Sequence, residues 1–141
     1  MDWGVSHIAI AVPSIARAAA ALRRTYGMEA SAPCENTAQG VRMAYVDLAG
    51  GGRLELMEPL TADSGVGRFL ARNPAGGVHH ISFSTPDIET SLQQLALRDV
   101  HVLGDGHSRN VHGDRIAFIH PRDFLGVLVE LEQAPGHGSD H

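Results

Sequence analysis

The sequence contains one pattern twice, and this duplication limits the folds that the chain can adopt. His7 stands in a segment of alternating polarity that is followed by a proline and an alanine-rich helical stretch. His80 stands in a second segment of the same kind, again followed by a proline and a helical stretch. Each half then ends in another alternating segment that contains a glutamate, Glu55 in the first and Glu130 in the second. The histidine and the glutamate are separated by 48 positions in one half and by 50 in the other, so the chain encodes two similar units.

The two halves predict the same order of elements. Period-two alternation predicts strands, and apolar residues at helical spacing predict helices. In the first half we expect a strand over 5–11, a helix over 15–25, a short strand and loop over 28–40, and strands over 41–48 and 53–58. In the second half we expect a strand over 78–84, a helix over 87–98, a short strand over 100–103, and strands over 114–119 and 127–132. Two tandem βαβββ units predict an α+β fold in which each sheet turns one face to its helix and the other to a cleft.

The chain length suits one domain with a real core, which we expect over residues 1–133. Its halves would lie at about 5–60 and 77–133. The connector over 61–76 carries a modest helical pattern. Residues 134–141 are rich in proline, glycine, serine and histidine and predict a disordered tail.

Composition excludes several classes of function. The chain is 43% hydrophobic and 19% charged, which is typical of a soluble globular protein. A net charge of −5 and the absence of a basic run give no reason to expect a nucleic-acid partner. All 11 basic residues are arginine, so a lysine Schiff base is excluded. The single cysteine, Cys34, excludes an intramolecular disulfide and is interpreted as a small turn residue.

The sequence also gives no sign of a membrane or secreted location. No apolar run approaches the roughly 20 residues of a membrane span. The N-terminus lacks the basic region and long apolar run of a signal peptide. We therefore expect a cytoplasmic protein without a membrane partner.

The alternation predicts the direction of the four side chains. The large apolar residues of each strand should pack under the helix of its half, which turns His7 and His80 toward the cleft. The same reasoning turns Glu55 and Glu130 toward it. His79 falls on the opposite face, where we expect a neutral, hydrogen-bonded core histidine.

Two imidazoles and two carboxylates at matched positions predict one divalent metal site. Singly, a strand histidine is more often structural and a strand glutamate is more often a solvated edge residue, so the combination carries the prediction. Nitrogen and oxygen donors together suit Co²⁺, Mn²⁺, Ni²⁺, Fe²⁺ or Zn²⁺ better than Ca²⁺. One or two open positions on an octahedral ion would accept substrate oxygens.

Six segments carry a resemblance to known proteins over about residues 5–133: 7–13, 39–42, 54–60, 77–81, 112–121 and 126–131. The chain resembles the vicinal oxygen chelate superfamily, whose glyoxalase-like domains are paired βαβββ units with a metal in the cleft. Within that superfamily it resembles in particular the methylmalonyl-CoA epimerase family. The last two segments are more specific than the metal pattern, which the whole superfamily shares.

The resemblance implies a function. The metal ligands would be His7, Glu55, His80 and Glu130, with Co²⁺ first among the candidate ions and Mn²⁺, Ni²⁺ and Zn²⁺ after it. The reaction would interconvert the 2R and 2S forms of methylmalonyl-CoA by proton transfer at C2 through an enolate. Ethylmalonyl-CoA is a reasonable second substrate. The resemblance also implies a homodimer.

An epimerase needs an acid/base group on each face of the reacting carbon. Glu130 is our candidate for one of them. Some relatives carry glutamates at the positions of Met43 and Ala38, so the second group stays open between Glu55, Glu35 and a metal-bound water.

Three further residues are candidate contacts for the acyl-CoA substrate: Gln39, His112 and Arg115. The loop over 104–115 could cover the substrate or approach the CoA phosphates. A solvated surface loop is an equally good interpretation.

Two alternatives share the fold. A glyoxalase-I-like lyase or isomerase would use the same four ligands on glutathione hemithioacetals, and fold analogy alone does not separate it from an epimerase. A drug-sequestering module of the bleomycin-resistance type would be non-catalytic. Such modules often lack the ligand set, so the presence of all four positions argues against that interpretation.

Overall fold

The computed structural model describes residues 1–104, 107–110 and 112–135, and these divide into two compact units. The N-terminal unit is His7–His79. The C-terminal unit combines Met1–Ser6 with the chain from His80 onward. The connector between the expected halves thus belongs to the N-terminal unit, whereas the first six residues belong to the C-terminal one. The expectation of a single domain over 1–133 stays a prediction.

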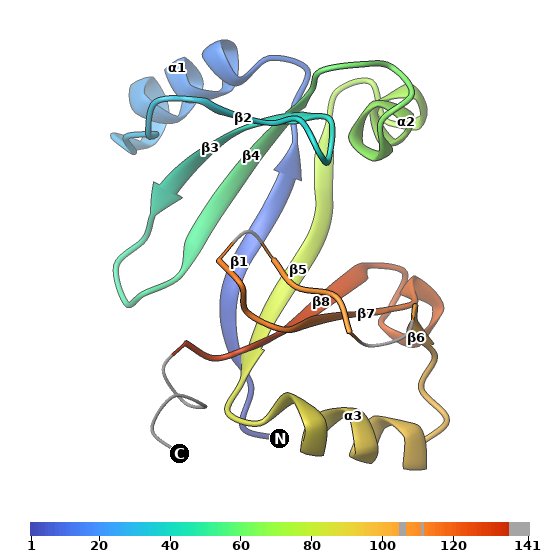
Figure 1. Ribbon diagram of the computed structural model, residues 1–141. Coiled ribbons are helices and arrows are strands. Elements are labelled where there is room, and N and C mark those ends of the chain that lie inside the picture. The colour runs from blue at the N-terminus through green and yellow to red at the C-terminus, as the bar shows by residue number, and fades with distance from the viewer. Residues whose placement is uncertain (105–106, 111, 136–141) are drawn as a thin grey trace. The chain divides into compact units, whose positions relative to one another are not determined.

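The N-terminal unit has the expected βαβββ order. Its elements are β1 (Gly4–Ala11, of which the first three residues belong to the other unit), α1 (Ile15–Tyr26), β2 (Cys34–Asn36), β3 (Val41–Asp47), β4 (Arg53–Pro59) and α2 (Gly65–Arg72). The strands lie in the order β2-β3-β4-β1, with β1 parallel to β4 and the other pairs antiparallel (Figure 1). Ser14 caps α1 by accepting a hydrogen bond from the Arg17 amide, and Gly27 ends it at φ 68°, a conformation that glycine adopts without strain.

The two faces of this sheet are covered by different helices. Ile10 and Leu56 belong to the cluster that packs against Ile15 of α1, as the alternation predicted. On the opposite face, Ala9 and Ala11 share a cluster with Val66 and Phe69, which lie on α2. The connector helix therefore covers part of the face that carries His7, which the sequence did not predict.

The C-terminal unit repeats the order with β5 (Gly77–Thr85, whose first three residues belong to the N-terminal unit), α3 (Ile88–Leu97), β6 (Val102–Leu103), β7 (Ile116–Ile119) and β8 (Leu128–Gln133). A short 3-10 helix over Pro121–Asp123 precedes β8. Strand β8 pairs with β5 in parallel and with β7 antiparallel, and β6 forms the edge beside β7. The α+β fold of two βαβββ units is therefore confirmed.

The core of the C-terminal unit lies between its sheet and α3. Phe83, Val129 and Leu131 belong to one cluster with Ile88 and Leu95 of the helix, as their alternation predicted. The same cluster includes Trp3, whose indole N–H donates to the Ser91 hydroxyl at 3.2 Å. These contacts explain why the first residues of the chain belong to this unit.

Most element boundaries differ from the expectation by one or two residues. The short strand and loop expected over 28–40 are confirmed, with β2 as the strand. The strand expected from residue 114 begins at Ile116, after the Asn110 side chain accepts hydrogen bonds from the amides of His112 and Asp114. At the C-terminus, the Ala134 amide donates to the Thr85 carbonyl. The disordered tail expected over 134–141 stays a prediction. Residues 136–141 lie outside the described residues.

No helix in the described part of the chain is both long enough and apolar enough to cross a membrane.

Candidate metal centre

The N-terminal unit contains a buried histidine–carboxylate pair. In the parallel pairing of β1 with β4, Ala9 stands opposite Glu55 and His7 stands opposite Arg53. His7 and Glu55 are thus diagonal neighbours on one face of the sheet, as the alternation predicted. The His7 Nδ1 and Glu55 Oε2 atoms are 3.1 Å apart, and the two side chains are only 10% and 13% exposed.

The His7 ring is neutral at pH 7 in this setting. Burial, and to a smaller extent the nearby Arg53 guanidinium, lowers the pKa of His7 from 6.5 to about 4. The close approach to Glu55 is therefore not an ion pair at pH 7. A neutral imidazole keeps the lone pair of one ring nitrogen, which can bind a metal ion.

The C-terminal unit contains the equivalent pair. Strand β5 carries His80 and β8 carries Glu130, and their parallel register sets Ser82 opposite Glu130. The His80 Nε2 and Glu130 Oε2 atoms are 3.8 Å apart, with side chains 10% and 11% exposed. The Ser82 hydroxyl donates to the other carboxylate oxygen, Oε1, at 3.3 Å.

A second repeated contact fixes the strand that carries each glutamate. Three residues after Glu55, Glu58 Oε1 accepts a hydrogen bond from the amide of Ile15, the first residue of α1, at 2.7 Å. Three residues after Glu130, Gln133 Oε1 accepts one from the amide of Ile88, the first residue of α3, at 2.9 Å. Both side chains satisfy an amide that has no partner within its helix.

His79 and His80 have different surroundings although they are adjacent. The His79 ring meets the Phe69 ring edge-on, with centroids 5.3 Å apart. Burial lowers the pKa of His79, so this ring too is neutral at pH 7. The neutral ring agrees with the expectation, but His79 is only partly buried and does not lie in the core. Its expected hydrogen bond stays a prediction.

The proposed substrate contacts are on or near the surface. Gln39 and His112 have exposed side chains, and the backbone amide of each donates to a neighbouring asparagine side chain. Arg115 Nη1 lies 2.5 Å from Glu89 Oε1, so its guanidinium already has a carboxylate partner on α3. The substrate-binding roles of these three residues stay predictions.

The positions where relatives carry further glutamates have no acid/base group here. Met43 belongs to the apolar cluster under α2, and Ala38 is exposed. Glu35, one of the alternatives, is half exposed and pairs with Arg42 at 3.4 Å.

Two residues that lie beside the glutamates are not evident from the sequence patterns. Tyr45 stands directly opposite Glu55 in the pairing of β3 with β4. Burial raises the pKa of Tyr45, and the charges of Glu55 and Cys34 raise it further. The Arg53 charge has the opposite, smaller effect. The second residue is Ser82, whose hydroxyl donates to Glu130. The sequence signal for it is the serine at the position where the first half has Ala9.

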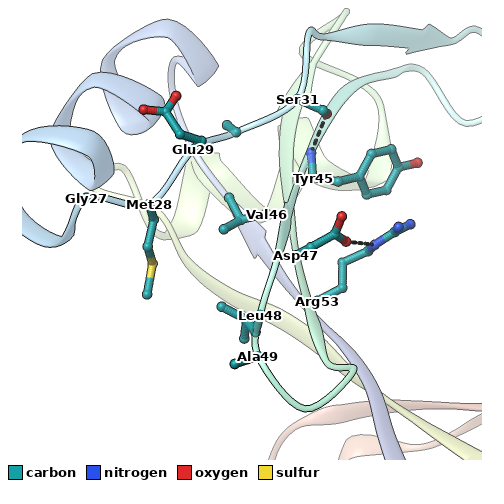
Figure 2. A pocket seen from close by; sticks show the side chains of 11 residues that line it. Gly27, Met28, Glu29, Ser31, Tyr45, Val46, Asp47, Leu48, Ala49 and Arg53 are labelled. Carbon is teal, nitrogen blue, oxygen red and sulfur yellow. Dashed lines mark hydrogen bonds and ion pairs between the residues drawn. The ribbon is translucent and has the colours of Figure 1, made fainter.

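A cavity of about 660 Å³ lies elsewhere in the N-terminal unit (Figure 2). It is lined by residues 27–31, residues 45–49 and Arg53. Arg53 Nε lies 3.1 Å from Asp47 Oδ1, and its guanidinium lies over the Tyr45 ring at 4.7 Å. Neither His7 nor Glu55 lines this cavity. The cavity is therefore separate from the histidine–carboxylate pair of this unit.

Residues 6–118 match the family described as Glyoxalase/Bleomycin resistance protein/Dioxygenase superfamily. An ethylmalonyl-CoA/methylmalonyl-CoA epimerase of Cereibacter sphaeroides is 42% identical over 130 residues, which cover 92% of this chain and 96% of the relative. The mitochondrial methylmalonyl-CoA epimerase of Homo sapiens is 38% identical over 130 residues, 92% of this chain and 73% of that one.

A solved structure is similar over nearly the same length. It is a single-residue variant of the Streptomyces coelicolor methylmalonyl-CoA epimerase in complex with 2-nitronate-propionyl-CoA, and it matches with a TM-score of 0.78 and 39% identity. The match covers 94% of this chain and 97% of that one.

Proposed function

Because the chain belongs to the Glyoxalase/Bleomycin resistance protein/Dioxygenase superfamily, we propose that it is an epimerase that interconverts (2R)- and (2S)-methylmalonyl-CoA. The observation that carries this proposal is the 42% identity, over nearly the full length of both chains, to an ethylmalonyl-CoA/methylmalonyl-CoA epimerase. That relative's name also supports ethylmalonyl-CoA as a second substrate. The complex of the Streptomyces coelicolor relative supports a CoA thioester as the substrate class. A homodimer belongs to the proposal as well.

We propose that His7, Glu55, His80 and Glu130 together hold one divalent ion. Each unit offers one imidazole nitrogen and one carboxylate, and all four side chains are nearly buried. The neutral ring of His7 is the form that binds a metal. Imidazole and carboxylate donors suit several divalent ions, and Co²⁺ is our first candidate, with Mn²⁺, Ni²⁺ and Zn²⁺ after it. When bound, the ion supplies positive charge beside the substrate oxygens on which negative charge develops.

The proposed reaction moves one proton. The hydrogen on C2 of methylmalonyl-CoA lies between a thioester and a carboxylate, and its removal as a proton leaves an enolate. A proton returned to the opposite face of C2 gives the other stereoisomer, with no net oxidation or reduction. Glu130 is our proposed acid/base group on one face.

Glu55 is our proposed acid/base group on the other face. It occupies the position in β4 that Glu130 occupies in β8, and its side chain is 13% exposed. Glu35 is a weaker candidate because it is 52% exposed and has Arg42 as its partner.

The proposed substrate contacts remain Gln39, His112 and Arg115. The exposed side chains of the first two can meet a ligand from solution. Arg115 would first have to exchange Glu89 for a substrate carboxylate or phosphate. The Glu89 side chain is 56% exposed, so water can compensate for that exchange.

The proposal is tested by incubating the protein with (2S)-methylmalonyl-CoA and resolving the two stereoisomers over time. We expect the 2R form to accumulate until the two forms are equal. The hemithioacetal of methylglyoxal and glutathione is the comparison substrate and should not be converted. Conversion of the hemithioacetal without epimerisation of methylmalonyl-CoA would contradict the proposal and favour a glyoxalase-I-like activity.

A further inference from the structure

The two carboxylate oxygens of Glu130 have different partners within the C-terminal unit. Oε2 lies 3.8 Å from His80 Nε2. Oε1 accepts the hydrogen bond of the Ser82 hydroxyl at 3.3 Å. Ser82 is fully buried on β5, directly opposite Glu130 in the pairing with β8. The hydroxyl therefore engages the oxygen that does not face the histidine.

The N-terminal unit shows what the same place looks like without a hydroxyl. Ala9 stands opposite Glu55 in the pairing of β1 with β4, as Ser82 stands opposite Glu130. Both residues are 0% exposed. Alanine is thus compatible with this place in the fold. A buried hydroxyl has a desolvation cost that its hydrogen bond must offset, so packing alone gives no reason for serine at residue 82.

We propose that Ser82 is a positioning residue for Glu130. Its hydroxyl holds Oε1 and thereby fixes the rotation of the carboxylate, so that Oε2 is the oxygen presented on the His80 side. Partners of this kind orient a ligand and adjust its affinity for the ion without touching the ion themselves. Ser82 thus acts through Glu130 and not on the substrate.

This inference rests on the proposed function in one respect, namely that Glu130 is a metal ligand and acid/base group. It adds one difference between the halves. The residue opposite Glu130 carries a hydroxyl, whereas the residue opposite Glu55 is Ala9, whose side chain has no donor.

The test compares three variants with the wild type. Ser82→Ala removes the hydroxyl and leaves the side chain found at Ala9. Ser82→Thr keeps a hydroxyl at the same position. Ser84→Ala is the matched control, because Ser84 lies on the same strand two residues further and stands opposite Glu132 rather than Glu130.

The first measurement is the dissociation constant for Co²⁺ with no substrate present, obtained by competition with a chromophoric chelator. We expect about tenfold weaker binding by Ser82→Ala, the lower end of the effect usual for a partner of a metal ligand. Ser82→Thr should stay within about threefold of the wild type. Ser84→Ala should match the wild type. Thermal unfolding of the metal-free proteins shows whether each variant is folded.

The second measurement is turnover at saturating Co²⁺. We expect kcat of Ser82→Ala to fall about tenfold while KM changes less than twofold, because the hydroxyl does not contact the substrate in this account.

Two results would overturn the inference. One is unchanged Co²⁺ affinity and unchanged kcat in a folded Ser82→Ala. The other is an equal loss in Ser84→Ala, since that residue stands opposite Glu132 and not Glu130. If Ser82→Ala binds Co²⁺ more weakly but the wild type does not epimerise methylmalonyl-CoA, the positioning role stands and the proposed function fails.

Discussion

The amide of Ile15 donates to the Glu58 carboxylate at 2.7 Å, which joins the start of α1 to the end of β4. The second half contains the same contact between Ile88 and Gln133, with an amide in place of the carboxylate. Each contact links a helix to the strand that carries a candidate ligand. The duplication therefore extends from the pattern of strands to individual hydrogen bonds.

This pair of contacts predicts the effect of two substitutions on stability. Glu58→Ala removes the acceptor, and we expect the free energy of unfolding of the metal-free protein to fall by about 2 kcal/mol. Glu58→Gln keeps an acceptor, as Gln133 does in the other half. It loses only the ion pair with Arg42, whose Nη1 lies 2.7 Å from Glu58 Oε2 with the arginine side chain 39% exposed, so the loss should stay below about 1 kcal/mol. Urea denaturation measures the free energy of unfolding of both variants. Equal losses in Glu58→Ala and Glu58→Gln would contradict a stabilising role for the hydrogen bond from the Ile15 amide.

The stability of the metal-free protein should depend on the protonation of His7. Its pKa is about 4 in the folded protein and 6.5 in the unfolded chain. Between these values the unfolded chain binds more protons, so the contribution of His7 to stability is full above pH 6.5 and is lost as the pH falls toward 4. The effect is at most about 1.4 kcal/mol per pH unit.

The His7→Gln variant isolates this effect because it cannot titrate at that position. The free energy of unfolding should fall more steeply in the wild type than in His7→Gln between pH 6.5 and 4. Parallel curves would show that His7 is not held neutral by burial.

Adjacent histidines offer a matched test of the ligand set. His80→Ala should weaken Co²⁺ binding at least about 100-fold and abolish turnover, since a lost ligand costs no less than a lost partner of a ligand. His79→Ala loses the ring contact with Phe69, so it should lower the melting temperature but keep the Co²⁺ affinity within about threefold. Circular dichroism should show folded protein in both cases. Equal loss of Co²⁺ affinity in the two variants would contradict the assignment of His80.

Much of this arrangement could be predicted from the sequence. Period-two alternation indicates where the strands lie and which face of the sheet each side chain occupies. Ile10 and Val129 pack on the helix side of their sheets, so His7 and Glu130 fall on the opposite side. Alignment of the two halves then places His80, and not His79, at the position equivalent to His7, so His80 is the candidate ligand. Local signals of this kind depend on neighbouring residues only.

The rest depends on contacts between distant segments. Alternation shows that Ala9 and Ala11 share a face, but not that α2 covers it. Likewise, the pairing of Arg115 with Glu89 on α3 arises from the packing of a helix against a sheet. No spacing in the sequence specifies which of several carboxylates an arginine will meet.

The roles of the two glutamates can be separated by following exchange and inversion independently. Glu130→Gln and Glu55→Gln each keep an oxygen donor but cannot accept a proton. In each variant we expect one stereoisomer of methylmalonyl-CoA to exchange its C2 hydrogen with solvent without inversion, because the remaining group serves only one face. The two variants should act on opposite stereoisomers. Full inversion at the wild-type rate in either variant would exclude that glutamate as an acid/base group.

The most direct test of the account is deuterium incorporation at C2 of methylmalonyl-CoA in D₂O, measured by mass spectrometry and chiral resolution. The metal-stripped protein should give only the background rate. Added Co²⁺ should restore rapid incorporation together with inversion at C2. Rapid incorporation and inversion by the metal-stripped protein, or a failure of the Co²⁺-loaded protein to exchange C2 at all, would contradict a metal-dependent epimerase.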